Sequence, residues 1–528
     1  MARKISHRLE LKGVLVALSP LHIGGAEEGL VSDMPLAIDG LGRPYLPGTS
    51  LGGAIRAHCR ATDEDIQRRC QSSAGSDKSW ADRHKFRWGF AERNDQGSAS
   101  QVVVDDAPAR GAPLAELWHG NGIDRRTGGA FEGIKYDREV LPQGSAFDFR
   151  LALEVCQGQD PDEHRGFLAW LAQELESGRV TLGAAGTRGL GRVKLIDTCC
   201  RESDWGSPEG ILAWVQGPGR DCQSSWKELL PRYAAPQPER VRIEIHWHPK
   251  GPLMSKAARD GLVPDGLPFV SRRTDGRLAL ALPGAGIKGA WRSHAERIVR
   301  TVLGLNADAE NHHEQVDVPI AADLFGRARP QDTKKGAGAP RSDDKRLKGR
   351  LGFDTCYADL ALPETEWDRL ERTEDLWQGR PGPERPMSLA MHVAVDRWTG
   401  GAADSLLFSA VEPAASVRWE PLALTFDASA DPAGERPLAE LALLWLALRD
   451  FCAGRIPLGY GVNRGYGDLE VTGVRIDGLK ALGLEPDSLE LEVKDGAIAE
   501  GAAGAPLAAL LATLETAWIR RLQNKEDE

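Results

Sequence analysis

The chain contains the same three motifs twice in the same order, and this internal repeat constrains its fold more than any other feature. The motifs are a Leu-Pro-Gly segment that leads into a helix, an Asp-Arg-x-Thr-Gly-Gly-Ala segment and a glycine-rich loop containing arginine. They occupy residues 46–54, 124–130 and 186–191 in the first copy, and 282–290, 396–402 and 461–467 in the second. The copies are roughly 230 to 275 residues apart, which is too long for a solenoid and fits two domains.

Hydrophobic periodicity predicts a β-α-β-β-α-β order in each copy. In the first copy we predict four strands, at 9–17, 101–104, 151–155 and 192–196, and two helices, at 51–60 and 167–176. We predict that 61–98 is an inserted segment and that 123–149 forms a long hairpin. In the second copy we predict strands at 241–247, 351–354 and 468–476, and helices at 291–303 and 438–451. The expected fold class is α+β, with two tandem ferredoxin-like (RRM-like) domains that carry inserted hairpins and loops.

Changes in composition place the domain boundaries. We predict a first domain at 1–200, a Gly-, Pro- and Ser-containing linker at 201–239 and a second domain at 240–478. The remaining segment, 479–528, contains a predicted strand and helix and is expected to be a C-terminal extension outside the duplicated unit.

Composition limits the classes of function. A net charge of −11 argues against a general polyanion binder, although residues 326–350 contain nine Lys or Arg against three Asp and leave room for a local basic surface. Eight scattered cysteines without a Cys-x-x-Cys pair fit a reducing compartment. With no apolar signal core and no apolar run of 18 residues, we expect a cytoplasmic protein without membrane contact.

Two aspartates at matched positions, Asp33 and Asp265, are the candidate catalytic residues. A carboxylate beside an RNA phosphate could act as general base on a 2′-hydroxyl or hold a divalent cation. The alternative is a plain turn residue, which the recurrence makes less attractive. The segment containing Gly48, Thr49 and Ser50 opens a helix, and its free N–H groups favour an anion such as phosphate.

Basic residues in the other two motifs are candidate RNA contacts. The glycine-rich loops precede strands rather than helices, which argues against dinucleotide binding. They would instead bring Arg188 and Arg464 to a phosphate backbone, or simply form tight turns. Arg125 and Arg397 of the hairpins could contact RNA or form structural Asp–Arg bridges, and His22 is either a loop histidine or a candidate base. A weaker pattern, without standard spacing, could bind a structural zinc ion through His58, Cys59, Cys70 and His84.

Taken together, these motifs resemble the Cas7-like RAMP proteins of type III CRISPR systems. The resemblance rests on LHIGG, DMPL, GRPYLPGTSLGGAIR, IDRRTGGAFEGIKYDREVLPQG and GTRGLG in the first copy, and it covers most of 9–200 and, more loosely, 240–478. A chain with two such copies is similar to the fused double-Cas7 subunit (Cas7-2x) of type III-D variant complexes.

The resemblance implies a subunit that binds a guide crRNA and cleaves target RNA with Mg²⁺ or another divalent cation, where its thumb hairpins enter the duplex. Asp33 and Asp265 would cut. RNA would be held by His22, Gly48, Thr49, Ser50, Arg56, Arg125, Arg188, Gly284, Lys288, Arg292, Arg397 and Arg464. The implied partners are crRNA, target RNA and other Cas7-like, Cas5-like, Cas10-like and Cas11-like subunits.

The second copy departs from the family pattern. It has no clear HIGG motif, and the proline after Asp265 is one residue later than the proline after Asp33. Asp33 is therefore the stronger catalytic candidate. Two alternatives stay open: a crRNA-binding scaffold that does not cut, and a standalone crRNA-processing endoribonuclease, for which His22 would be the candidate base.

Overall fold

The computed structural model describes residues 3–25, 32–71, 87–91, 97–217, 220–221, 226–228, 240–258, 260–307, 309–327, 347–372, 386–428, 435–499 and 504–523. Its contacts divide into two compact units. The first contains Met1–Trp118, Arg138–Gly186 and Leu190–Pro238, and the second contains His119–Asp137, Thr187–Gly189 and Glu239–Glu528. The second unit therefore includes the outer part of the first copy's hairpin and three residues of its glycine-rich loop.

The first unit is built on an antiparallel sheet in the order β11-β10-β1-β9-β5. These strands are β1 (Ile5–Ala17), β5 (Val102–Val104), β9 (Ala146–Cys156), β10 (Val193–Asp204) and β11 (Arg220–Asp221). Its helices are α1 (Gly48–Gln71), α3 (Pro161–Glu176) and α4 (Pro208–Gln216). Alternate residues of β1, such as Leu9 and Leu11, point into a core that also buries Phe167 and Leu171 of α3.

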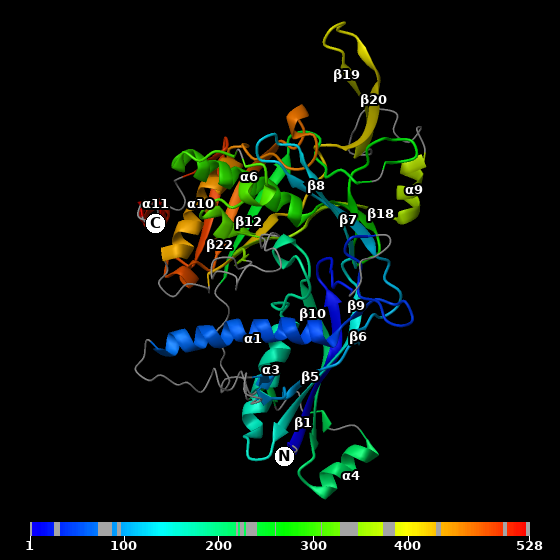
Figure 1. The fold of residues 1–528 in the computed structure, drawn as a ribbon, viewed down its shortest axis with the longest axis vertical. Coiled ribbons are helices and arrows are strands. Elements are labelled where there is room, and N and C mark those ends of the chain that lie inside the picture. Colours follow the sequence, from blue (N-terminus) through cyan, green and yellow to red (C-terminus); the bar gives the residue numbers. More distant parts are fainter. Residues whose placement is uncertain are drawn as a thin grey trace, which may run out of the picture. The chain divides into compact units, whose positions relative to one another are not determined.

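The second unit repeats this layout around a larger sheet, in the order β17-β21-β12-β22-β23-β24. Its strands are β12 (Arg240–Pro249), β17 (Leu351–Phe353), β21 (Leu422–Asp427), β22 (Leu469–Asp477), β23 (Ser488–Lys494) and β24 (Ala497–Ile498). The helices α6 (Gly284–Leu303) and α10 (Glu435–Cys452) pack on each other and on the sheet, and α11 (Gly504–Gln523) packs on α10 (Figure 1). Trp291 and Phe451 join the two inner helices in the core.

Shorter elements decorate both units, and two long hairpins stand out. The hairpins are β7 (Glu116–Ile123) with β8 (Ala130–Val140), and β19 (Met387–Val395) with β20 (Ala402–Pro413); the latter extends away from the rest of its unit in Figure 1. The others are β2 (Tyr45–Leu46), β3 (Phe90–Ala91), β4 (Gly97–Ser98), β6 (Ala107–Pro108), β13 (Val270–Arg272), β14 (Leu278–Leu282), β15 (Gly326–Arg327), β16 (Leu347–Lys348), β18 (Cys356–Leu362), α7 (His312–Gln315), α8 (Ala321–Phe325) and α9 (Glu364–Arg372).

The predicted ferredoxin-like order is confirmed in both copies. Numbering the four core strands of each copy along the chain, the sheet order is 4-1-3-2 in both, with a long helix after the first strand (α1, α6) and another after the third (α3, α10). Within the described residues, no helix is long and apolar enough to span a membrane.

Several predicted boundaries differ from the structure. Helix α1 continues to Gln71 rather than ending at 60, and β10 runs on to Asp204, through the predicted domain boundary at 200. The predicted C-terminal extension is part of the second unit's fold, since β23 pairs with β22 and α11 covers α10. Residues 72–86 and 92–96 of the predicted insertion at 61–98 lie outside the described residues, as do residues 328–346 of the basic segment at 326–350.

Candidate nucleic-acid interface

Asp33 is exposed in a loop that is held at the base of the first copy's hairpin. The Glu139 carboxylate of β8 accepts hydrogen bonds from the Ser32 hydroxyl (3.0 Å) and from the Leu36 backbone N–H (3.0 Å). The Glu139 N–H also donates to the Met34 carbonyl oxygen (3.0 Å). Three hydrogen bonds to one residue therefore fix the backbone on both sides of Asp33, while Asp33 itself stays exposed to solvent.

Asp265 occupies the corresponding place in the second copy. Gly266 forms a parallel bridge to Ala410 of β20, as the residue after Asp33 does to β8. The register after the two aspartates is therefore the same, although the prolines that follow are one position apart. Here the hairpin holds the aspartate directly, because Ser409 donates its backbone N–H (2.7 Å) and its hydroxyl (3.1 Å) to the Asp265 carboxylate. The Asp265 carboxylate thus fastens its own loop, a task that Glu139 performs in the first copy.

His22 is buried and has an internal partner. Its Nδ1 lies 2.7 Å from the Glu139 carbonyl oxygen, to which it donates. Burial lowers the pKa of His22 below its ordinary value of 6.5, which keeps the ring neutral at pH 7. The His22 side chain therefore holds the loop in place, and it does not lie on the surface where RNA could contact it. Its counterpart in the second copy is Met254. The carbonyl oxygens of His22 and Met254 each accept a hydrogen bond from the N–H of a residue that directly follows a glycine in the neighbouring loop.

The glycines at the two helix starts are required by close packing. A Cβ on Gly48 would lie 2.3 Å from the Val104 carbonyl oxygen, and one on Gly284 would lie 2.4 Å from that of Phe353. The Gly48 N–H already donates to the Asp106 carboxylate (2.7 Å), which takes the place predicted for a phosphate. Neighbouring side chains are more open: Thr49, Ser50 and Arg56 are exposed along the first turns of α1.

The two glycine-rich loops are equal in length, although the motifs recognised in the sequence, 186–191 and 461–467, differ by one residue. Ala185 and Gly461 start the loops with φ of 61° and 71°, and Gly189 and Gly465 close the short helical turns with φ of 85° and 86°. Both turns therefore present an exposed arginine, Arg188 in one and Arg464 in the other, at the same position. The guanidinium of Arg464 stacks over Tyr460 (4.8 Å) and Phe408 (5.4 Å).

Lys288 and Arg292 of α6 face inward. The Lys288 ammonium is buried and donates to the Thr187 hydroxyl (3.0 Å) and to the Leu351 carbonyl oxygen (2.9 Å). Burial, together with the nearby cations Arg188, Arg292 and Lys348, lowers the pKa of Lys288 to about 7. Arg292 donates to the Glu296 carboxylate (2.6 Å) and to two backbone carbonyls. Both residues stabilise the unit from within, whereas the exposed Arg188 and Lys348 add positive charge at its surface.

The structural alternative holds for Arg125, although its partner is a glutamate. Its Nε donates to the buried Glu296 carboxylate at 2.6 Å, and only 8% of the Arg125 side chain is exposed. Its twin in the second copy, Arg397, is exposed. The two arginines therefore have the same sequence context and different surroundings.

His58, one of the four candidate zinc ligands, has a carboxylate partner. Its Nε2 lies 3.0 Å from Glu174, which also accepts from Arg179 (2.6 Å); His294, Asp450 and Arg455 repeat this arrangement in the second unit. Of the other candidate ligands, Cys59 is buried, and His84 and the Cys70 side chain lie outside the described residues. Among the residues that are described, no group of three or more His, Cys, Asp or Glu could hold a metal ion.

The pairing of Glu174 with His58 and Arg179 makes the stability of the fold depend on pH. Burial by itself would raise the pKa of Glu174, but hydrogen bonds and charges of His58 and Arg179 lower it from 4.5 to about 2. The unfolded state therefore binds the proton more tightly, and the stabilisation present above pH 5 is lost as the pH falls toward 2. Chemical denaturation at pH 6 and pH 3.5 should show a smaller difference in unfolding free energy for Glu174→Gln than for wild type. Glu209→Gln, at an exposed position, should behave like wild type; an unchanged pH dependence in Glu174→Gln would contradict the assignment.

Sequence reasoning missed a polar cluster at the base of the second hairpin. Tyr466 of the glycine-rich loop donates to Glu412, and His392 Nε2 lies 3.0 Å from the same carboxylate and 2.9 Å from the Tyr466 hydroxyl. The first copy has Leu190 in the place of Tyr466. The presence of a tyrosine inside a glycine-rich loop is the one signal that could have revealed it.

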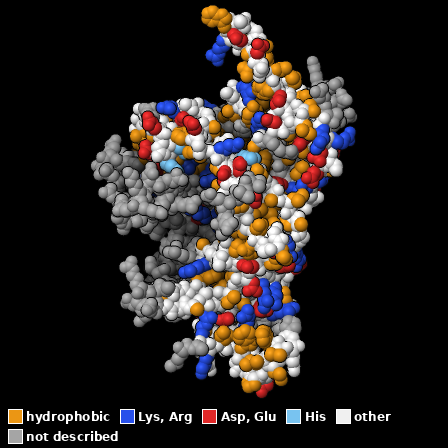
Figure 2. Space-filling model, turned by 45° about the vertical axis from the view of Figure 1, so that its right-hand side comes forward, with side chains coloured by type: hydrophobic (Ala, Val, Ile, Leu, Met, Phe, Trp, Pro, Cys, Tyr) orange, Lys and Arg blue, Asp and Glu red, His pale blue; other side chains and the backbone are white. Residues whose placement is uncertain are grey.

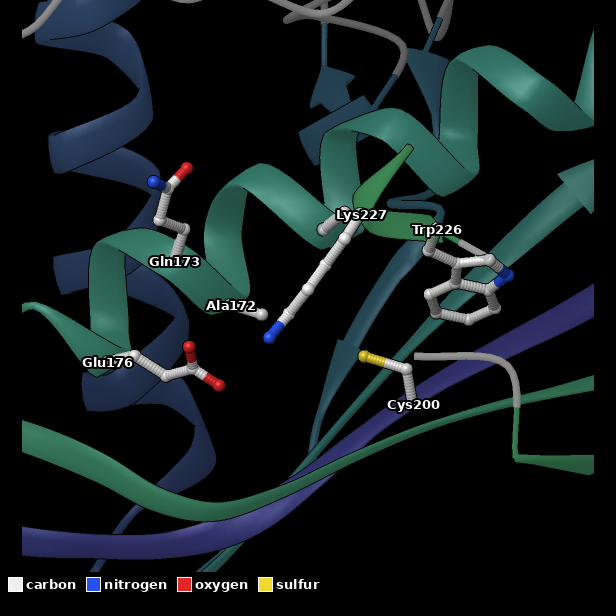
Figure 3. Close-up of a pocket in the computed structure, with 7 residues that line it drawn as sticks. Ala172, Gln173, Glu176, Cys200, Trp226 and Lys227 are labelled. Carbon is white, nitrogen blue, oxygen red and sulfur yellow. The ribbon is translucent and has the colours of Figure 1, made fainter. Parts of the chain in front are cut away.

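A cavity of about 200 Å³ in the first unit is separate from these features. Trp226 and Cys200 form one part of its wall and the polar ends of Lys227 and Glu176 approach from another, as Figure 3 shows. None of the candidate site residues lines it. The cavity therefore does not define the candidate interface.

Comparisons with known proteins agree with the repeat. The family model described as the RAMP superfamily matches residues 14–194 and 266–470, which together exceed half of the chain. The chain is also 27% identical over 200 residues to the CRISPR system Cms endoribonuclease Csm3 of Methanocaldococcus jannaschii. That match covers 35% of this chain and 78% of the archaeal protein.

Proposed function

The chain belongs to the RAMP superfamily, and we propose that it is a Cas7-like backbone subunit of a type III CRISPR effector that binds crRNA and cleaves complementary target RNA. The observation that carries the proposal is the repeated placement of an exposed aspartate loop, held by hydrogen bonds at the base of a long hairpin. The name of the archaeal relative, an endoribonuclease of a CRISPR system, supports the same reaction. Fusion of two copies favours the double-Cas7 type of subunit.

Asp33 is the proposed catalytic residue. Its carboxylate would accept the proton of a target 2′-hydroxyl, whose oxygen then attacks the adjacent phosphorus as the 5′-oxygen leaves and takes a proton from water. The products are a 2′,3′-cyclic phosphate and a 5′-hydroxyl. The exposed Arg56, in the same unit as Asp33, would bind phosphate groups of the RNA, and the exposed Arg188 and Arg464 would do so in the second unit. Binding that holds the RNA in line would supply much of the rate.

A divalent cation fits this site only as an ion shared with RNA. Asp33 supplies one carboxylate, and no described cluster offers three ligands, so phosphate oxygens and water would complete the shell around Mg²⁺. When bound, the cation would stabilise negative charge that develops on the phosphate. Asp33 would then hold it instead of, or in addition to, accepting the proton.

The proposal is tested by assembling the effector complex with its guide RNA and adding labelled target RNA, with Mg²⁺ or with EDTA. We expect cleavage of the complementary target at regular intervals, ends carrying 2′,3′-cyclic phosphate, and no cleavage of a scrambled target. A complex that binds guide and target without cutting would favour the scaffold function. Cleavage of crRNA precursor by the chain alone would favour the standalone nuclease, an alternative that the burial of His22 makes less attractive.

Glu139 is a proposed positioning residue, since it fastens the loop around Asp33. Replacing it by alanine removes both hydrogen bonds that its carboxylate accepts. We expect Glu139→Ala to lower kcat for the Asp33-dependent product about 10- to 100-fold, because displacing a reacting group by about 1 Å can cost about 100-fold in rate, with guide binding unchanged. Val411→Ala, at the matching place in the second copy, should leave that product unaffected. A loss of all products, or of guide binding, would instead indicate general unfolding.

A further inference from the structure

The polar cluster at the base of the second hairpin is specific to the second copy. It consists of Tyr466, His392 and Glu412. The first copy has no ionisable side chain at the three matching positions, which are occupied by Leu190, Gly120 and Val140. Figure 2 shows the projecting hairpin to which the cluster belongs, with hydrophobic and charged side chains exposed along it.

Two donors meet at the Glu412 carboxylate. The Tyr466 hydroxyl donates to one of its oxygens, and His392 Nε2 lies 3.0 Å from the same oxygen. Tyr466 is buried, while 14% of the Glu412 side chain and 26% of the His392 side chain are exposed, so the cluster is partly shielded and still open to protons. With Glu412 ionised and His392 neutral the cluster carries one negative charge, and one added proton cancels it.

A stack of side chains connects this cluster to Arg464. The His392 ring stacks on Phe408 with centroids 5.0 Å apart, and the Arg464 guanidinium lies 5.4 Å from the centroid of the same Phe408 ring. Tyr466 also belongs to the same loop as Arg464, two residues further on. Stacking holds the guanidinium by its face and leaves N–H groups at its edge for a phosphate. The cluster therefore acts on Arg464 both by position and by charge.

We propose that Tyr466, His392 and Glu412 are positioning residues that make RNA binding by the second copy depend on proton uptake. They hold Arg464 ready for an RNA phosphate, and the proton that the cluster gains removes a negative charge that weakens this contact. RNA affinity at Arg464 should therefore rise as the pH falls from 8 to 6. The proposal rests on RNA binding in the proposed function and is independent of RNA cleavage.

The other groups around the stack are compatible with this direction. Burial raises the pKa of the Glu412 carboxyl above its ordinary value of 4.5, against the opposing effect of its hydrogen bond with His392, which brings proton uptake closer to neutral pH. Imidazole is the side chain that normally changes charge between pH 5 and 8. Beside the stack, Lys256 lies 6.0 Å from the Tyr460 ring centroid and is paired with Asp260 at 3.4 Å.

The first copy supplies the comparison. Its arginine, Arg188, donates to the Tyr136 hydroxyl (3.4 Å), at the place where Arg464 meets Phe408. The first hairpin also has a histidine, His119, which is paired with Asp137. His119 is one residue before the position that matches His392, and neighbouring residues of a strand point to opposite faces. His119 is therefore a matched control histidine.

The test measures binding of labelled guide RNA by the full chain at pH 6 and pH 8, at one ionic strength. We expect wild type to bind about 3- to 10-fold more tightly at pH 6, the size expected when one nearby unit charge is neutralised at a partly solvated site. His392→Gln keeps an amide donor but cannot take up the proton, so it should lose most of this gain. Glu412→Gln removes the charge permanently and should bind more tightly than wild type at pH 8, an increase that unfolding cannot produce.

Controls separate this cluster from other titrating groups. His119→Gln and Arg188→Ala should keep the wild-type pH dependence, whereas Arg464→Ala should lose it. Isothermal titration calorimetry at pH 7, in buffers of different ionisation enthalpy, counts the protons taken up with RNA. Wild type and His119→Gln should take up more protons than His392→Gln.

Two results would overturn the proposal while RNA binding stands. One is an equal pH dependence in wild type and His392→Gln, and the other is a Glu412→Gln variant that binds no more tightly than wild type at pH 8. Absence of guide RNA binding at both pH values would instead overturn RNA binding in the proposed function, and this proposal with it.

Discussion

Replacing Asp33 by asparagine is expected to reduce cleavage of target RNA at the sites it serves by about 100-fold or more, the usual contribution of a general base. The substitution keeps the shape of the side chain and removes its basicity. The loop should keep its position, because it is Glu139, not Asp33, that accepts the bonds from Ser32 and Leu36. Guide RNA binding should therefore stay at the wild-type level.

Asp265→Asn is the matched comparison. Its carboxylate already accepts two hydrogen bonds from Ser409, so we expect the products made by Asp33 to persist in this variant. The measurement is a gel of target fragments for wild type, both single variants and the double variant, with guide binding measured in parallel. If Asp265→Asn removes a distinct product, both copies cut. If neither variant changes any product, the chain is a scaffold and our assignment of Asp33 is wrong.

Replacing Glu296 by alanine is expected to destabilise the second unit by about 3 to 5 kcal/mol, because it leaves buried positive charge without its counterion. Glu296 accepts bonds from Arg125 and Arg292, both at 2.6 Å, and Arg300 lies 3.9 Å from the same carboxylate. Such a loss corresponds to a fall in the melting temperature on the order of 10 °C.

The matched arginines Arg125 and Arg397, at the tips of the two long hairpins, supply the control for this prediction. Arg125→Ala should cost about 3 kcal/mol, since it breaks a buried pair from the other side. Arg397→Ala, at the same place in the exposed tip, should stay within about 0.5 kcal/mol of wild type. Chemical denaturation of the isolated chain measures all three variants. Equal effects of the two arginine substitutions would show that the tip of the first hairpin is not held by Glu296 in solution.

The internal repeat allowed most of the fold to be predicted from the sequence. Alternating apolar residues such as Leu9 and Leu11, and helical spacing such as Phe167 and Leu171, reflect burial on one face, which periodicity records directly. Ends of elements were less predictable. Helix α1 runs past Arg60 through polar residues, and β10 continues through Cys199 and Cys200, because pairing with β1 decides where that strand stops.

Function at single residues divides in the same way. The sequence by itself determined that the chain is two copies of one α+β domain, and that Asp33 and Asp265 stand at matched places, because both facts are written in motif order and spacing. Only the tertiary structure decided which residues at matched positions also have the same burial and the same partners. Arg125 is buried against Glu296 while Arg397 is exposed, and Asp265 is bonded to Ser409 while Glu139 does that work for Asp33. Burial and partner choice depend on residues more than a hundred positions away, and no local pattern contains them.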